Sequence, residues 1–245
     1  MPLPFVSVLM PVYNGIACGR GYLEKAVASI VLQEYDGPIE LIVVDDGSTD
    51  TTYASLRSME TAISREFLSR RLVVVRTGHF GVTPALNSGL LRCNGEFIAR
   101  SDADDYSAPE RIQRQVQFLL EHPDIGLLGT SARIVRGTKV GEVGFKCNNP
   151  ITRDTFLTGN PFCHGSVMFR KVVIATVGGY NTEYQHSQDY DYFWRVSKSF
   201  GTHILDDPLY FYRIHPKRIT STPSRYSLQV RCAKRIKQQI LRDTQ

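Results

Sequence analysis

The chain has 245 residues, of which 42% are hydrophobic and 22% charged, the composition of a globular protein. No apolar run approaches the length that a bilayer-spanning helix needs, and the amino terminus lacks the charged region of a signal peptide. The formal charge of +5 suits an anionic partner, such as a nucleotide, a phospholipid surface or a nucleic acid, without choosing among them. The five cysteines are odd in number and show no metal-ligand spacing, so we expect a reduced, cytoplasmic protein.

Strands and helices alternate through the first hundred residues. We expect strands at 6–12, 39–44, 72–75 and 95–99, and helices at 21–33, 48–67 and 81–91. The run at 39–44 is apolar throughout, which is typical of a strand covered on both faces. Ser48 or Thr49 is expected to cap the helix that follows it. This alternation predicts an α/β fold with a doubly wound, mostly parallel sheet flanked by helices.

The second half of the chain is less regular. We expect a helix at 108–122, a strand at 125–135, a loop or hairpin at 137–150, a strand at 166–170, a helix at 188–199, a strand at 209–215 and a helix from 226. One domain over residues 1–222 is therefore predicted, with halves of about 1–106 and 107–222. Residues 223–245 follow it as a helical extension.

Two predicted strand ends carry acidic pairs, Asp45 with Asp46 and Asp102 with Asp104. In an open α/β sheet both ends would face one crevice at the carboxyl edge of the strands. Asp102 and Asp104 can reach the same side of an extended chain, where they would repel each other. Mg²⁺ or Mn²⁺ would relieve that repulsion and keep open positions for substrate phosphates. The alternative is an Asp-rich turn that caps the next helix.

Seven segments, in order along the chain, resemble the signature segments of family 2 glycosyltransferases with the GT-A fold. They lie at 6–14, 43–50, 98–105, 160–170, 177–181, 187–191 and 212–215. Within that family they are most similar to enzymes that build bacterial lipopolysaccharide, capsule or exopolysaccharide. The resemblance implies a nucleotide-binding half over about 1–106 and an acceptor-side half over about 107–222. It also implies transfer of a sugar, with inversion, from a nucleotide-sugar donor to a hydroxyl of a glycan or lipid-linked glycan.

The resemblance also implies a donor site. Asp46 would contact the ring N–H of uracil in a UDP-sugar, and Pro11 and Tyr13 would line the base pocket. Asp45 is the less favoured candidate, and for Asp46 the alternative is a helix-capping turn. Asp102 would approach the ribose and the metal.

A divalent cation, Mn²⁺ or Mg²⁺, is the implied cofactor. Asp104 would bind it directly, and Asp102 and His215 would complete the site. The metal would act as a Lewis acid on the diphosphate leaving group. For His215 the alternative is an ordinary loop histidine before Pro216.

Asp189 is the residue that the resemblance places as the general base. It would take the proton of the acceptor hydroxyl as that oxygen attacks the anomeric carbon, and Asp191 is the competing candidate. Relatives usually carry Glu-Asp where this chain has Gln188 and Asp189. His164 either lines the acceptor pocket or forms a hydrogen bond within the second half of the fold.

Charge neutralisation of the diphosphate is one point where the chain departs from the family. Many relatives carry an arginine where Leu86 stands. Without that arginine, Arg76, Arg100 or the metal is expected to neutralise more of the diphosphate charge.

Two other functions fit parts of the pattern: a nucleotide-sugar-binding protein that has lost catalysis, and a nucleotidyltransferase on a similar fold. A nucleic-acid-binding module is not expected, because the chain shows neither aromatic–basic interleaving nor zinc-finger spacing.

The last segment is basic and amphipathic. Four apolar residues recur every four positions, and six basic residues surround them: Leu228, Cys232, Ile236 and Ile240; Arg225, Arg231, Lys234, Arg235, Lys237 and Arg242. Two interpretations stay open. Either the stripe packs on the domain and the charges face water, or the helix at 225–242 makes a peripheral contact with the anionic inner face of the membrane.

Overall fold

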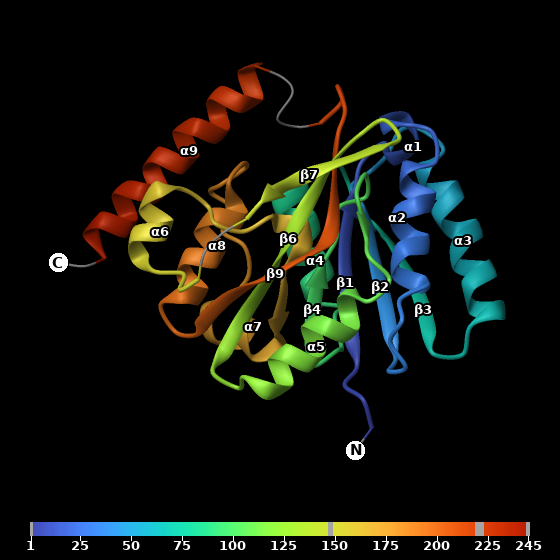
Figure 1. The fold of residues 1–245 in the computed structure, drawn as a ribbon. Helices are drawn as coiled ribbons and strands as arrows, with labels where there is room; N and C mark the ends of the chain where they lie inside the picture. The colour runs from blue at the N-terminus through green and yellow to red at the C-terminus, as the bar shows by residue number, and fades with distance from the viewer. Residues whose placement is uncertain (1, 147–148, 219–222, 244–245) are drawn as a thin grey trace.

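The computed structural model describes residues 2–146, 149–218 and 223–243 (Figure 1). Its described strands form one sheet in the order β3-β2-β1-β4-β8-β6-β9-β5, and β7 pairs with the second half of β6. Helices cover both faces of this sheet. The predicted α/β class with a mostly parallel central sheet is confirmed, and the expected domain boundary at residue 222 lies outside the described residues.

The amino-terminal part of the sheet is wholly parallel. It consists of β1 (Val6–Val12), β2 (Ile39–Asp45), β3 (Arg70–Arg76) and β4 (Phe97–Arg100). Every residue of β2 is buried, as its unbroken apolar run predicts. Val12 pairs with Asp45, and Leu9 pairs with Arg100. The carboxyl ends of β1, β2 and β4 therefore lie at one edge, where the acidic segments follow them.

The carboxy-terminal part of the sheet is mixed. β8 (Met168–Arg170) runs antiparallel to both β4 and β6 (Ile125–Arg136), whereas β9 (Gly201–Ile214) runs parallel to β6. β5 (Tyr106–Ser107) pairs antiparallel with the end of β9, and β7 (Lys139–Phe145) forms a hairpin with β6. The strand expected at 209–215 is therefore much longer, because its first half pairs with β6.

Helices occupy most of the predicted ranges. They are α2 (Tyr22–Val31), α3 (Thr52–Glu66), α4 (Val82–Leu90), α5 (Arg111–Glu121), α8 (Gln188–Ser197) and α9 (Pro223–Arg242). Three short helices were not expected: α1 (Gly15–Cys18), α6 (Arg153–Thr158) and α7 (Lys171–Val177). The start of the helix expected at residue 48 was wrong, because Thr51 is the N-cap of α3. Ser48 instead accepts a hydrogen bond from the backbone N–H of Asn14 (2.8 Å), which ties the loop to β1.

The two faces of the sheet bury separate apolar clusters. Val8 and Met10 of β1 face the cluster under α2, α3 and α5, while Leu9 faces the cluster under α4, α7, α8 and α9. This alternation follows from the two-residue period of a strand. The packing on both faces fixes the edge at which the strands end.

Helix α9 packs on the domain, as one of the two interpretations of its apolar stripe predicts. Ile236 and Ile240 are fully buried, and Cys232 is partly buried against the same cluster. At the end of the helix the Asp243 carboxylate accepts hydrogen bonds from Trp194 Nε1 (3.0 Å) and Lys198 Nζ (2.9 Å). Figure 1 shows α9 alongside α6 and α8. Within the described ranges, no helix is both long and apolar enough to cross a membrane.

Candidate active site

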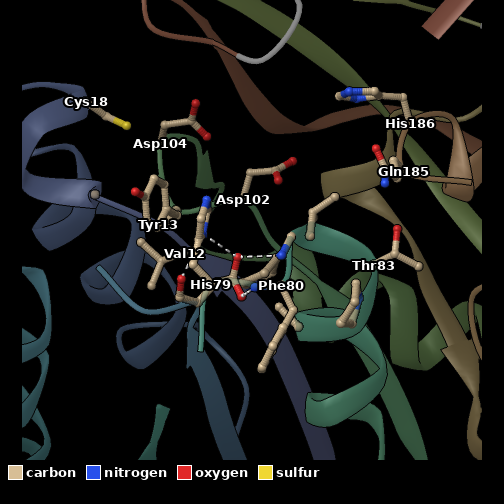
Figure 2. Close-up of a pocket in the computed structure, with 18 of the residues that line it drawn as sticks. Val12, Tyr13, Cys18, His79, Phe80, Thr83, Asp102, Asp104, Gln185 and His186 are labelled. Atoms are coloured by element: carbon tan, nitrogen blue, oxygen red, sulfur yellow. Dashed lines mark hydrogen bonds and ion pairs between the residues drawn. The ribbon is translucent and has the colours of Figure 1, made fainter. Parts of the chain in front are cut away.

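A cavity of about 560 Å³ lies at the carboxyl ends of β1, β2 and β4 (Figure 2). Pro11, Tyr13, Asp46, Asp102 and Asp104 line it, so both acidic strand ends reach the same space. Figure 2 shows Asp104 on one side of the cavity and Gln185 and His186 on the opposite side. The geometry therefore joins the two predicted acidic segments with the loop that precedes α8.

Asp46 organises one wall of this cavity. Its buried carboxylate accepts hydrogen bonds from the backbone N–H groups of Phe80 (2.9 Å) and Gly81 (2.8 Å). Nδ1 of His79 lies 3.0 Å from Asp46 Oδ2, and the His79 ring stacks on Tyr13 with centroids 3.9 Å apart. Asp46 thus holds the loop before α4 rather than the start of α3. The helix-capping alternative for Asp46 was wrong.

Asp45, the less favoured donor residue, has a different environment. It is fully buried, and its Oδ1 accepts a hydrogen bond from the backbone N–H of Ser48 (3.1 Å). Arg76 Nε lies 3.5 Å from its Oδ2. Asp45 therefore fastens the loop after β2 and does not line the cavity described above.

The carboxylates after β4 are crowded. Asp102 Oδ1 accepts a hydrogen bond from Arg100 Nη2 (2.7 Å), and Asp105 Oδ1 accepts one from the backbone N–H of Arg213 (2.7 Å). Burial raises the pKa of Asp102, with Arg100 acting to lower it and Asp104 to raise it. Burial and the charges of Asp104 and Asp102 raise the pKa of Asp105 well above its usual range.

Asp104 and His215 are adjacent in space, because β5, which follows Asp104, pairs with the part of β9 that precedes His215. Oδ2 of Asp104 lies 2.8 Å from Nε2 of His215, which follows β9. Asp102 is paired with arginine instead, so two of the three predicted metal ligands are adjacent. Among the residues that the structure describes, no three His, Cys, Asp or Glu side chains form a metal-binding group.

These residues nevertheless fit a divalent cation that shares its coordination with a substrate. Mg²⁺ is commonly held by one or two carboxylates together with substrate phosphates, and both oxygen and imidazole ligands suit Mn²⁺. Burial is the main cause of the raised pKa values of Asp102 and Asp105, and the charge of Asp104 adds to both; a nearby cation would relieve that repulsion. The donor set at Asp104 and His215 is thus chemically suitable for the predicted metal.

Asp189 lies in the first turn of α8, where a side-chain hydrogen bond holds its carboxylate. Its Oδ2 accepts from Asn160 Nδ2 (2.7 Å). Burial raises the pKa of Asp189 to about 6, backbone N–H groups act to lower it, and the charge of Asp102 raises it. Asp191, the competing candidate, is buried and forms an ion pair with Arg195 (2.9 Å) one turn along the helix.

His164 forms the hydrogen bond that one of its two interpretations predicted. Its Nε2 lies 3.1 Å from the hydroxyl oxygen of Tyr180, and its ring packs edge-on against Phe193. Burial, with a contribution from Arg100, lowers the pKa of His164 well below its usual range, so the ring is neutral. Thr182, Gln185 and His186 line the cavity on this side.

The positive charges at the cavity are not those considered from the sequence. Arg76 donates to the backbone carbonyl of Ser48 and lies over the ring of Tyr53, and Arg100 is buried against Asp102. Lys217 and Arg218 line the cavity instead. In the sequence, these two residues closely follow the signature segment at 212–215, and that position could have identified them.

Solved structures share this fold. The S. aureus TarS fragment 1-349 in complex with UDP-GlcNAc superposes with a TM-score of 0.68 at 22% identity, covering 96% of this chain and 66% of that one. Mannosyltransferase PcManGT from Pyrobaculum calidifontis, in complex with GDP-Man and Mn²⁺, gives a TM-score of 0.66 at 19% identity, covering 94% and 65%. This chain therefore spans just under two thirds of the length of those two solved chains. The architecture is that of the GT-A glycosyltransferases.

Sequence comparison identifies the family. EpsE of Bacillus subtilis is 32% identical over 225 residues, which cover 84% of this chain and 72% of EpsE. The amylovoran biosynthesis glycosyltransferase AmsE of Erwinia amylovora is 30% identical over 194 residues, covering 78% and 68%. Residues 7–178 match the family model described as Glycosyl transferase family 2. The chain therefore belongs to glycosyl transferase family 2.

Proposed function

We propose that this glycosyltransferase moves a sugar from a nucleoside-diphosphate donor, with UDP the favoured nucleotide, to a hydroxyl of a glycan or lipid-linked glycan. Transfer would invert the anomeric carbon. The observation that carries the proposal is the convergence of Tyr13, Asp46 and Asp104 on one cavity, with His215 paired to Asp104 and Asp189 near enough to Asp102 to feel its charge. TarS with UDP-GlcNAc and PcManGT with GDP-Man, which share the fold, both hold nucleoside-diphosphate sugars.

The donor would extend across the cavity from the Tyr13 wall toward the end of β9. Its base would stack on Tyr13 beside Pro11 and donate a ring N–H to Asp46. The ribose would approach Asp102. Lys217 and Arg218 would supply positive charge to the diphosphate, in place of the arginine that Leu86 replaces.

Asp104 and His215 would hold Mn²⁺ or Mg²⁺ together with the donor phosphates. A cation bound there supplies Lewis-acid stabilisation of the charge that develops on the leaving diphosphate. The Mn²⁺ in the PcManGT complex supports this assignment at the level of the shared fold.

Asp189 would be the general base. The acceptor oxygen forms its bond to the anomeric carbon while the bond from that carbon to the diphosphate oxygen breaks, and the hydroxyl proton moves to Asp189. A pKa of about 6 leaves this carboxylate ionised at neutral pH, yet makes it a stronger base than an ordinary aspartate. Asn160 would orient it through the hydrogen bond to Oδ2.

A polysaccharide or its lipid-linked precursor is the acceptor class that we propose. AmsE, a relative at 30% identity, is named for the biosynthesis of amylovoran. The cavity is also lined by the neutral hydrogen-bonding side chains of Thr182 and Gln185, which suit sugar hydroxyls.

Helix α9 would bring the enzyme to an anionic membrane surface. Its buried stripe leaves Arg231, Lys234 and Arg242 exposed. Tyr226 and Leu241 expose apolar side chains beside these charges. Basic residues with neighbouring apolar ones are the combination that interfacial helices use.

A binding measurement tests the donor site. We expect UDP to bind more tightly in Mn²⁺ than in EDTA, whereas uridine, which lacks phosphates, shows no such difference. Asp104→Ala should abolish the effect of Mn²⁺ because it removes a direct ligand. Lys217→Gln should weaken UDP but retain the response to Mn²⁺. Asp154→Ala is the matched control, because that carboxylate is exposed on α6.

Isothermal titration of each variant with UDP and uridine gives the comparison. The metal assignment is wrong if Asp104→Ala responds to Mn²⁺ as the wild type does. The donor site as a whole is wrong if the wild type binds no nucleoside diphosphate.

A further inference from the structure

His79 makes both of the contacts that the proposed donor site reserves for a nucleobase. Its planar ring stacks on Tyr13, with centroids 3.9 Å apart and planes 19° from parallel. Its Nδ1 lies 3.0 Å from Asp46 Oδ2, and since a carboxylate only accepts, Nδ1 is the protonated nitrogen of this hydrogen bond. Tyr13, Asp46 and His79 all line the cavity, and Figure 2 shows His79 beside Tyr13. A flat ring that stacks on Tyr13 and donates N–H to Asp46 is the description of a bound base.

We infer that His79 occupies the base position in the free protein and that the donor binds by displacing it. This inference rests on the proposed function, because it takes the Tyr13–Asp46 wall as the base site. Atoms in contact need about 3.5 Å between them, so one face of Tyr13 cannot stack on two rings at this position. The same oxygen of Asp46 also faces only one ring nitrogen. His79 therefore competes with the base.

The surroundings of His79 allow this exchange. Its side chain is 58% exposed, so it has room to turn toward solvent. Gly78 and Gly81 flank the two-residue segment, and Gly81 has a φ of +97°, a conformation that favours glycine. The backbone N–H groups of Phe80 and Gly81 stay bound to Asp46 when the imidazole leaves. The loop is thus anchored by its backbone while one side chain moves.

The exchange also sets a requirement on the base. Removing His79 takes one N–H donor from the buried Asp46 carboxylate, whose Oδ2 keeps the hydrogen bond from Gly81 and regains a position for a second donor. Uracil and guanine can replace it, because each carries a ring N–H on its pairing edge. Cytosine and adenine present a ring acceptor there, which would face the carboxylate lone pairs. UDP and GDP should therefore bind in preference to CDP and ADP.

Calorimetry with UDP on His79→Ala tests the inference. If His79 blocks the site in most free molecules, its removal raises the competent fraction and tightens UDP binding by about tenfold, the size expected from losing one ring stack and one partly exposed hydrogen bond. The preference for UDP over CDP should remain, since Asp46 is unchanged. His122→Ala is the matched control, because His122 also stacks on an aromatic ring (Phe118, centroids 4.0 Å) but outside the cavity.

The outcomes separate the inference from the proposed function. His79→Ala binding UDP more weakly would mean that His79 covers the bound base rather than taking its place, and unchanged affinity would mean that it does not compete. Either result overturns the inference while the donor site stands. Failure of the wild type to bind any nucleoside diphosphate overturns both. Circular dichroism before the titration confirms that each variant is folded.

Discussion

The carboxylates in and near the cavity have different hydrogen-bond and ion-pair partners. Asp46 is held by backbone N–H groups, Asp102 is paired with an arginine, and Asp104 faces a histidine. Asp189 accepts a hydrogen bond from the neutral amide of Asn160, and burial raises its pKa to about 6. The first three can orient a donor or hold a cation, whereas Asp189 is suited to take a proton. At the scale of residues, the proposed division of roles follows from the partners of each carboxylate.

The role of Asp189 is tested by Asp189→Asn, which keeps the shape but removes the carboxylate. General-base catalysis contributes about 10²–10⁴-fold, so turnover should fall by that factor while the dissociation constant of UDP stays within a few-fold of the wild type. Asp191→Asn is the control, because it breaks a structural ion pair and should reduce stability more than turnover. Near-normal turnover of Asp189→Asn would move the role to Asp191.

The pH profile of kcat gives an independent readout of the same residue. Only the ionised carboxylate accepts a proton, so kcat should fall as pH drops through about 6, two units above the range of an ordinary aspartate. Asn160→Ala removes a donor that favours the charged form, which should shift this acid limb to higher pH. An acid limb near pH 4 would contradict the assignment.

Elements with strong local patterns were predicted from the sequence, and those that depend on distant partners were not. The apolar runs of β1 and β2 gave their bounds to within a residue. The first half of β9 was missed because residues 201–208 contain Asp206, Asp207 and Pro208, and only pairing with β6 makes them a strand. Helices α6 and α7 are too short to show a helical period.

The exposed face of helix α9 is proposed to contact an anionic membrane surface. The triple variant Arg231→Gln, Lys234→Gln, Arg242→Gln should lose binding to phosphatidylserine-containing vesicles by about 100-fold, since each basic residue near an anionic surface contributes on the order of 1 kcal/mol. A variant with the same charge change elsewhere, at Arg65, Arg71 and Arg92, should bind as the wild type does. Co-sedimentation at low and high salt measures the difference. Equal binding of the two variants, or binding indifferent to salt, would contradict the membrane contact.

At the scale of the whole molecule, the topology brings together groups that sequence spacing does not relate. The strand-end carboxylates were predicted because they follow recognisable strands. The contact between His79 and Asp46 spans 33 residues, and Lys217 donates to the carbonyl of Ala17 across 200 residues. Neither pair leaves a local pattern. The cavity is thus acidic where the strands end and basic where the chain leaves β9, and the net charge of +5 conceals this division.

The central claim, that this cavity cleaves a nucleoside-diphosphate sugar and transfers the sugar, is tested most directly by nucleotide release from a donor panel. The panel is UDP-glucose, UDP-galactose, UDP-N-acetylhexosamines and GDP-mannose, each with Mn²⁺ and glycan acceptors. The wild type should release nucleotide from at least one donor, and Asp104→Ala should release none above background. No release from any donor by the wild type, or equal release by Asp104→Ala, would contradict the account.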